Sequence, residues 1–220
     1  APGNPGTSYE KLVKNVPIEA DETSLLVDFA QAEKIDLTIV GPEAPLAAGV
    51  VDAFEAAGLL CFGPTKQAAI LEASKSYTKD FLKRYGIPSG DYEVFVDIDS
   101  AVDYINSVPI PVVVKADGLA AGKGVVVAVT RDQALKAAHD MLEENAFGDA
   151  GAKIVVEEFL TGEEASFICM TDGVTAIPFA SSQDHKARDD GDKGPNTGGM
   201  GAYSPAPIID DEMEQEIIRT

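Results

Sequence analysis

The first 74 residues alternate between short apolar runs and segments whose apolar residues follow helical spacing. This pattern predicts helices over residues 22–34 and 45–58, and buried strands over residues 35–41 and 59–64. Strands and helices that alternate at this spacing are typical of parallel βαβ units. Residues 1–74 are therefore expected to form part of a doubly wound α/β domain with a parallel sheet, since two strands are too few for a complete one.

The pattern changes to an α+β arrangement after a helix predicted over residues 75–88, which Gly86 and Pro88 should end. Four strand-like apolar runs and two segments with helical spacing follow between residues 91 and 160. The strands are expected in "YEVFVD", "IPVVVKAD", "GVVVAVT" and "KIVVEEFL", and the helices in "DSAVDYINS" and "RDQALKAAHDMLEEN". We therefore expect a second domain over residues 75–220, with residues 91–160 as a small subdomain.

Beyond residue 160, two apolar runs predict a β-hairpin that turns at Asp172–Gly173. Residues 184–207 are polar and rich in glycine, and they show little periodicity. A long loop is expected there, and a loop of that length in a compact protein is usually functional or disordered.

The composition is that of an ordinary globular protein, with 45% hydrophobic and 25% charged residues among 220. The formal net charge of −20 argues against nucleic acid as a partner, because phosphate contacts need a basic surface. No apolar run has the length of a membrane span, and the chain does not open on a signal-like segment. We therefore predict a cytoplasmic protein that contacts neither nucleic acid nor membrane.

Cysteine and histidine are scarce in this chain. Cys61 and Cys169 both lie in apolar runs and are predicted to be buried free thiols. The two histidines, His139 and His185, are too few for a histidine-rich metal site. For His185, a catalytic base, an orienting donor and an ordinary loop histidine all stay open.

A glycine-rich segment, "KADGLAAGKGV", follows an apolar strand and precedes another. Its glycines allow the backbone to approach a ligand, and backbone N–H groups together with lysines suit a phosphate cradle. The residues concerned are Gly118, Gly122, Gly124, Lys115 and Lys123. The spacing is not that of a Walker motif, which opens a helix, so we expect a flap that closes over phosphates. A mobile hairpin with solvated lysines is the alternative.

Two further segments supply polar groups of other kinds. In "VVEEFLTGEEAS", acidic pairs flank a strand end, whose free carbonyl and N–H match an adenine edge and whose carboxylates could accept ribose hydroxyls. A solvated acidic turn is the alternative there. The segment "KGPNTGGMGAYSPAP" offers backbone and side-chain donors suited to small anions.

Seven motifs occur in a fixed order along the chain: "GPEAPL", "FGPT", "SKSYTKDFLKRYGIP", "KADGLAAGKGV", "VVEEFLTGEEASF", "SQDHK" and "GPNTGGMGAYSPAP". Together they resemble the glycinamide ribonucleotide synthetase family of phosphoribosylamine–glycine ligases, within the ATP-grasp superfamily. The resemblance covers nearly all 220 residues. It implies a truncated Rossmann-like N-terminal domain over residues 1–74 and an incomplete ATP-grasp domain over residues 75–220, with residues 91–160 as its ATP lid.

The resemblance implies ATP-dependent ligation of glycine to 5-phosphoribosylamine in purine biosynthesis. Glycine would take the γ-phosphate of ATP to give glycyl phosphate and ADP, and the amine of phosphoribosylamine would then displace phosphate. The implied cofactors are ATP and Mg²⁺ or Mn²⁺, the partners are small-molecule substrates, and a monomer is expected. Another ATP-grasp carboxylate–amine ligase and a nucleotide-binding fragment without activity are the alternatives.

The resemblance also implies roles for individual residues, although none is assigned as a catalytic group. ATP would be bound by Lys75 and Lys115 at the phosphates, the flap of Gly122, Lys123 and Gly124, Glu157, the backbone of Glu158 and Leu160 at the adenine edge, and Glu164 at the ribose. The substrate side would be formed by Pro42, Glu43, Asp184, Lys186, Asn196, Thr197, Gly198, Gly199 and Met200.

The chain departs from the family pattern at both ends. Family members begin with a strand and a "GGREHA"-like turn that binds phosphoribosylamine, and this chain starts after it. Their metal ligands, an acidic residue and an asparagine, lie on a later strand and are expected beyond residue 220. We therefore expect a fragment whose isolated 220 residues are inactive.

Overall fold

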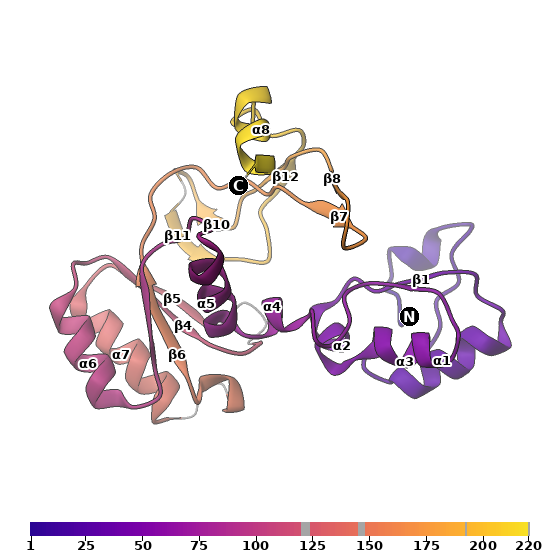
Figure 1. The fold of residues 1–220 in the computed structure, drawn as a ribbon, viewed down its shortest axis with the longest axis horizontal. Helices are drawn as coiled ribbons and strands as arrows, with labels where there is room; N and C mark the ends of the chain where they lie inside the picture. The colour runs from indigo at the N-terminus through magenta and orange to yellow at the C-terminus, as the bar shows by residue number, and fades with distance from the viewer. Residues whose placement is uncertain (120–123, 145–147, 192, 220) are drawn as a thin grey trace. The chain divides into compact units, whose positions relative to one another are not determined.

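The structure is a computed structural model. It describes residues 1–119, 124–144, 148–191 and 193–219, without the side chains of residues 148, 149, 193, 195 and 196. The chain divides into two compact units, Ala1–Phe159 and Leu160–Thr220 (Figure 1).

The N-terminal part of the first unit alternates helices with two short parallel strands. Its elements are η1 (Thr7–Tyr9), α1 (Thr23–Ala32), β1 (Thr38–Ile39), α2 (Glu43–Ala48), α3 (Val50–Ala56), β2 (Cys61–Phe62) and α4 (Ile70–Ala73). β1 pairs with β2 in parallel, with Thr38 opposite Cys61. The prediction of a parallel α/β arrangement is thus confirmed.

The single helix predicted over residues 45–58 is wrong. The chain forms two helices, α2 and α3, which meet at Gly49 in the left-handed region with φ of +99°. Apolar spacing continues across the break and so conceals it, because Val50, Val51 and Phe54 are all buried. Gly58, with φ of +72°, takes the left-handed conformation just beyond α3, as predicted for a helix end.

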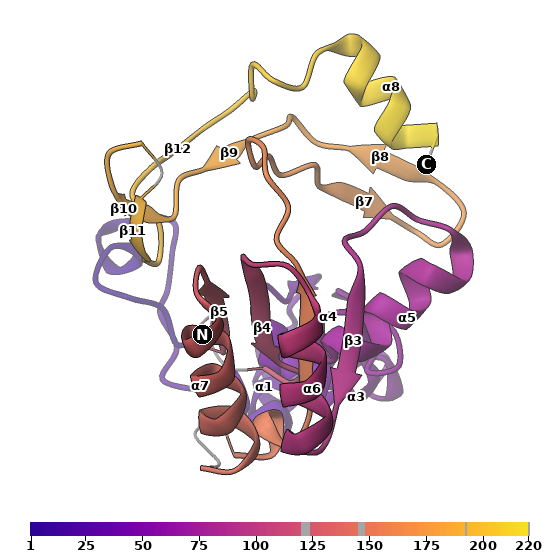
Figure 2. The same cartoon turned by 90° about the vertical axis from the view of Figure 1, so that its left-hand side faces the viewer.

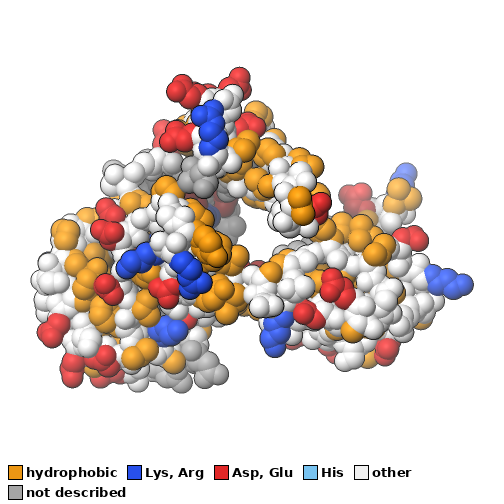
Figure 3. All heavy atoms as spheres, viewed as in Figure 1, with side chains coloured by type: hydrophobic (Ala, Val, Ile, Leu, Met, Phe, Trp, Pro, Cys, Tyr) orange, Lys and Arg blue, Asp and Glu red, His pale blue; other side chains and the backbone are white. Residues whose placement is uncertain are grey.

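The predicted burial of the first two strands is only half correct. Val40 and Cys61 pack against the core formed by α1, α2 and α3, whereas Ile39 and Phe62 lie opposite each other in the register and are exposed. Successive side chains of a strand point to opposite faces, so a two-stranded sheet with helices on one side leaves the other face open. Figure 3 shows hydrophobic side chains among charged ones on the visible surface of the chain.

A four-stranded antiparallel sheet and the helices on one of its faces enclose the larger of the two hydrophobic cores of the first unit. Its elements, after helix α5 (Lys75–Tyr85), are β3 (Tyr92–Phe95), α6 (Ile98–Ser107), β4 (Val112–Ala116), β5 (Val125–Ala128), α7 (Arg131–Leu142), η2 (Gly148–Gly151) and β6 (Ile154–Glu158). The strand order is β3-β6-β4-β5, which places β6 and β4 at the centre. The predicted α+β order of four strands and two helices is confirmed.

The two faces of this sheet differ in chemistry because side chains alternate along β4 and β6. Val112, Val114, Ile154 and Val156 face α6 and α7 and are buried in the main core, on the side that Figure 2 shows covered by these helices. The intervening positions, which include Lys115 and Glu157, lie on the other face, where α5 contacts β6. The sheet therefore separates an apolar core from a charged face.

Local signals define the ends of the helices around the sheet. Ser74 caps α5, Asp97 caps α6, and a capping box of Thr130 and Gln133 begins α7. α5 ends at Gly86, whose φ of +68° is left-handed, as predicted.

The second unit contains two strand pairs, a hairpin and a short helix. β7 (Cys169–Thr171) and β8 (Ala176–Pro178) form the predicted hairpin, in which Asp172 Oδ1 accepts hydrogen bonds from the backbone of Val174 and Thr175. The prediction that Cys169 is buried is wrong, because this two-stranded hairpin leaves the residue exposed, whereas Cys61 is half-buried. α8 (Asp211–Arg219) follows near the end of the chain.

The long loop predicted over residues 184–207 instead contains short paired strands. β9 (Gln183–Asp184) pairs with β12 (Ala202–Tyr203), and β10 (Ala187–Asp189) pairs with β11 (Lys193–Asn196), all antiparallel. Polar, glycine-rich strands of two to four residues have no apolar alternation, so their backbone pairing leaves no periodic signal in the sequence. Among the residues that the structure describes, no helix combines the length and apolarity needed to cross a membrane.

The buried face of β6 generates a stability prediction. Val156 is fully buried, whereas Val96 is 69% exposed. Val156→Ala removes two buried carbons and leaves a cavity, so we expect the free energy of unfolding to fall by about 2–3 kcal/mol. Val96→Ala, the matched control, should change it by less than about 0.5 kcal/mol. Urea denaturation measures both, and equal effects would contradict the placement of β6 in the core.

Candidate functional site

The beginning of α5 is fixed to the end of β4 by Asp117. Asp117 Oδ1 accepts a hydrogen bond from the backbone N–H of Ser76 at 2.6 Å, and its carbonyl accepts one from that of Lys75 at 3.1 Å. The Ser74 hydroxyl also donates to the Asp117 carboxylate, and Lys153 Nζ lies 3.6 Å from it. The first N–H groups of a helix have no partner within the helix, and a negative charge there is stabilised by the helix dipole. Asp117 supplies both the hydrogen-bond acceptors for these N–H groups and the negative charge.

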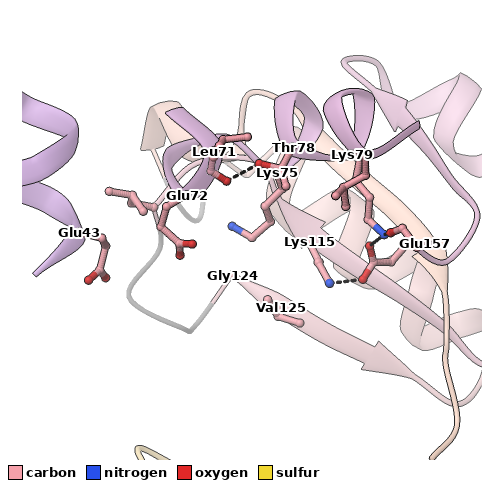
Figure 4. A pocket seen from close by; sticks show the side chains of 13 residues that line it. Glu43, Leu71, Glu72, Lys75, Thr78, Lys79, Lys115, Gly124, Val125 and Glu157 are labelled. Carbon is pink, nitrogen blue, oxygen red and sulfur yellow. Dashed lines mark hydrogen bonds and ion pairs between the residues drawn. The ribbon is translucent and has the colours of Figure 1, made fainter. Parts of the chain in front are cut away.

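Three lysines converge on the charged face of the sheet. Lys75 is the first residue of α5, Lys79 lies one turn further along the same helix, and Lys115 is in β4. Figure 4 shows the ammonium of Lys75 in the cavity on the side of Glu72, whereas those of Lys79 and Lys115 meet at Glu157. Lys75 Nζ also donates a hydrogen bond to the carbonyl of Gly118 at 3.0 Å.

The carboxylate of Glu157 lies between two of these lysines. Its Oε2 is 2.8 Å from Lys79 Nζ, and its Oε1 forms an ion pair with Lys115. The Glu157 side chain is only 9% exposed. Burial raises the pKa of Glu157, but the contacts with Lys115 and Lys79 outweigh this effect and bring the pKa below its ordinary value. Glu157 is therefore a buried anion compensated by two cations.

Lys75 is in a different electrostatic position. Burial lowers the pKa of its ammonium, Asp117 acts in the opposite direction, and Lys115 lowers the pKa further. A partly desolvated ammonium gains more from a bound anion than a fully hydrated one does. Lys75 is thus suited to bind an anionic group.

These groups line a cavity of about 390 Å³ within the first unit, of the size that small-molecule sites have. Both charged and apolar side chains line it (Figure 4). The charged ones are Lys75, Lys79, Lys115, Glu43, Glu72 and Glu157, and the apolar ones include Leu71, Leu82, Leu119 and Val125. Such walls can hold a molecule that has both an anionic and an apolar part.

The structure brings together five of the predicted residues of the first unit in this cavity, namely Glu43, Lys75, Lys115, Gly124 and Glu157. Pro42 is the N-cap residue of α2 and immediately precedes Glu43. Glu158 is exposed. Its backbone N–H donates a hydrogen bond to the carbonyl of Asp91 at 2.8 Å, and its Oε2 accepts one from the backbone N–H of Asp91 at 3.2 Å. Its carbonyl therefore lies at the end of the central strand β6.

The second unit contains the remaining predicted residues. Glu164 and Lys186, which were predicted for ribose and for substrate respectively, form an ion pair at 2.7 Å. This hydrogen bond is the main reason that the pKa of Lys186 is raised. Both side chains are largely exposed, so the pair contributes little to stability and can separate for a ligand. Leu160, the first residue of this unit, is also exposed.

The predicted substrate segment is held to β9 and its neighbours by backbone hydrogen bonds. The N–H groups of Thr197 and Met200 donate to the carbonyls of Lys186 and His185, both at 2.7 Å. Gly199 has φ of +123°, and a Cβ there would lie 3.3 Å from Asp184 Oδ1. A Cβ at Gly198, between Thr197 and Gly199, would meet open space. The segment from Thr197 to Met200 therefore approaches Asp184 at Gly199.

Three predictions concern parts of the chain outside this description. Gly122 and Lys123 are outside the described residues, as is the side chain of Asn196, whose backbone belongs to β11. Within the described part of the chain, no group of three or more His, Cys, Asp or Glu side chains is placed to hold a metal ion.

The sequence reasoning missed two residues of the site, Lys79 and Asp117. A signal for Lys79 exists, because it follows Lys75 by four positions on the helix predicted over residues 75–88 and must share its face. Asp117 follows Lys115 at the strand end, but the sequence does not reveal that the start of a helix 41 to 43 positions earlier meets it.

The chain matches known proteins over its whole length. Residues 1–72 match the family model of the phosphoribosylglycinamide synthetase N domain, and residues 73–220 match that of the ATP-grasp (A) domain. The phosphoribosylamine–glycine ligase of Allochromatium vinosum is 62% identical over 219 residues, 100% of this chain and 51% of that protein. The Yersinia pestis ligase is 60% identical over 218 residues, 99% of this chain and 51% of that one.

The fold is also similar to that of a solved relative. The crystal structure of phosphoribosylamine–glycine ligase from Thermotoga maritima superimposes with a TM-score of 0.80 at 31% identity, over 99% of this chain and 51% of that chain. The chain thus spans about half the length of the relatives it matches. On these matches, the chain belongs to the phosphoribosylglycinamide synthetase family, with sequence from both its N domain and its ATP-grasp (A) domain.

Proposed function

We propose that this chain provides the ATP-phosphate site of an ATP-dependent phosphoribosylamine–glycine ligase. The observation that carries the proposal is the convergence of Lys75, Lys79 and Lys115 on one cavity that contains a single deeply buried carboxylate, Glu157. The family membership and the relatives' names support the same reaction.

Phosphoryl transfer depends mainly on positioning and on neutralising charge, and Lys75 and Lys115 would contribute to both. Lys75 would contact a phosphate oxygen, because its ammonium lies in the cavity and has lost part of its hydration. Lys115 would approach from the strand side of the same cavity. The segment that contains Gly122 and Lys123, together with Gly124, would cover the phosphates and keep water from the reactive intermediate.

The rest of the nucleotide would be bound by groups at and beyond the end of β6. The carbonyl of Glu158 and the N–H of Leu160 would meet the adenine edge, with Glu157 as a further acceptor. Glu164 would accept the ribose hydroxyls after separating from Lys186, a change that costs little for an exposed ion pair.

In the proposed reaction, a carboxylate oxygen of glycine bonds to the γ-phosphorus of ATP as the bond to the ADP oxygen breaks. The products of this step are glycyl phosphate and ADP. The amine of 5-phosphoribosylamine then attacks the glycyl carbonyl carbon, loses a proton and releases phosphate, which leaves the amide. Mg²⁺ or Mn²⁺, when bound, would neutralise phosphate charge.

The substrate side of the proposal consists of Pro42 and Glu43 in the first unit and Asp184, Lys186 and residues 196–200 in the second. Pro42 and Glu43 follow a parallel strand at its carboxyl end, where open α/β sheets bind ligands. The backbone N–H groups of the glycine-rich segment suit anionic groups of glycine or phosphoribosylamine. A monomeric state and a cytoplasmic location remain predictions.

Substitution of the two phosphate-side lysines tests nucleotide binding by this chain. Lys75→Ala and Lys115→Ala should each weaken ATP binding by about 10- to 100-fold, because each removes a charge-assisted hydrogen bond. Isothermal titration calorimetry measures the Kd. Lys136→Ala is the control, since Lys136 is an exposed residue of α7 paired with Asp140. An unchanged Kd in either variant would show that the lysine concerned does not bind ATP.

The ligase reaction is tested in the intact protein that carries this chain. With ATP, Mg²⁺ and 5-phosphoribosylamine present, we expect phosphate release that requires glycine, because glycine is the acceptor of the γ-phosphate. Mass spectrometry should detect glycinamide ribonucleotide in the same mixture. Phosphate release at the same rate without glycine, or with no amide product, would contradict the proposed reaction.

A further inference from the structure

Lys79 differs from the other lysines of the cavity in how completely its ammonium is bound by the protein. Its Nζ lies 2.8 Å from Glu157 Oε2, 2.7 Å from Ser89 Oγ and 3.3 Å from the carbonyl oxygen of Gly90. The ammonium donates hydrogen bonds to Ser89 and Gly90, and Glu157 is its ion-pair partner, so all three contacts hold it in place. The side chain is only 14% exposed, and the ring of Tyr92 lies 5.7 Å from Nζ.

Lys115 shares the same carboxylate but is bound far less completely. Its side chain is 26% exposed, and Glu157 is the acceptor that its ammonium contacts among the described residues. Like Lys79, it lines the cavity. Movement of Lys115 toward a ligand would therefore break one contact, whereas movement of Lys79 would break three.

The difference in the number of contacts between Lys79 and Lys115 determines which of the two lysines stays paired with Glu157 when an anion enters the cavity. We propose that Lys79 is a positioning residue: it keeps Glu157 in place and compensates its charge, so that Lys115 is free to exchange Glu157 for a phosphate oxygen of the nucleotide. The inference rests on the proposed function, because it takes the anion to be the phosphate of ATP.

The charges around Glu157 show why a permanent partner is needed. Lys79 faces it from α5 and Lys115 from β4, Tyr92 of β3 lies opposite it in the register, and Lys75 of α5 acts on it at longer range. If Lys115 leaves and Lys79 is absent, the buried carboxylate loses both direct ion pairs. An unpaired buried carboxylate is costly and becomes protonated instead. Nucleotide binding would then require the uptake of a proton by Glu157.

The experiment compares Lys79→Met, which retains the aliphatic stem but removes the charge, with Lys79→Arg, which restores a cation. Lys83→Met is the matched control, because Lys83 lies one turn further along α5 and also approaches the Tyr92 ring at 5.7 Å. Calorimetric titration with ATP at pH 6, in two buffers of different ionisation enthalpy, gives both the Kd and the number of protons taken up.

For Lys79→Met we expect ATP binding to weaken about tenfold, the factor equivalent to one pKa unit, and up to one additional proton to be taken up. Lys79→Arg and Lys83→Met should behave as the wild-type chain. In a Glu157→Gln background, Lys79→Met should have no further effect on the Kd. A direct phosphate contact by Lys79 would instead weaken binding in that background too, and would overturn its role as a positioning residue.

A measurement without ligand separates this inference from the proposed function. The side-chain carboxyl carbon of Glu157, assigned by Glu157→Gln, should titrate by NMR below the ordinary pKa of 4.5 in the wild-type chain and higher in Lys79→Met. Should circular dichroism show that Lys79→Met is unfolded, Lys79→Gln makes the same comparison.

The outcomes are distinguishable. A chain that binds ATP but whose Glu157 titration and proton uptake are unaffected by Lys79→Met would overturn the role of Lys79 alone. A wild-type chain that does not bind ATP would overturn the proposed function, and the exchange at Lys115 with it.

Discussion

The ion-paired carboxylate of Glu157 is the interaction on which the arrangement of the site depends. Strand alternation places Val156 in the apolar core and therefore forces Glu157 onto the opposite face of β6. A buried carboxylate there requires cations, and these come from two elements, α5 and β4. The pairing connects the helix to the sheet and places three lysines around one cavity. The same contact thus brings ammonium groups to a cavity that is also lined by the carboxylates of Glu43, Glu72 and Glu157.

The clustering of three ammonium groups stands out because the chain as a whole is strongly acidic, with a net charge of −20. A distant negative surface is screened by salt, whereas charges within a cavity are screened much less. Inside the cavity, the electrostatic potential therefore depends mainly on the charged groups that line it, among them the ammonium groups of Lys75 and Lys115. Within the second unit, backbone hydrogen bonds to His185 and Lys186 hold residues 197–200.

Apolar periodicity predicted the four-stranded sheet, its two covering helices and helix α5, because burial on a regular face leaves a regular pattern. It failed where backbone conformation or backbone pairing determines structure. The left-handed Gly49 divides a helix without interrupting its apolar spacing, and β9 to β12 pair without apolar side chains. Candidate residues such as Lys75, Lys115 and Glu157 were found from motifs. Lys79 could have been found from its position four residues after Lys75 on the predicted helix, whereas Asp117 acts through contacts with a distant segment, which no local pattern indicates.

The hydrogen bonds of Asp117 have a consequence for how this sequence can evolve. One carboxylate satisfies the start of α5 from a position more than forty residues later in the chain. A substitution at Asp117 would therefore change the fitness effect of substitutions at Ser74 and Ser76, and the reverse also holds. We expect these positions to show epistasis and to be exchanged together in successful chimaeras, even though a recombination point between α5 and β3 would interrupt neither a helix nor a strand.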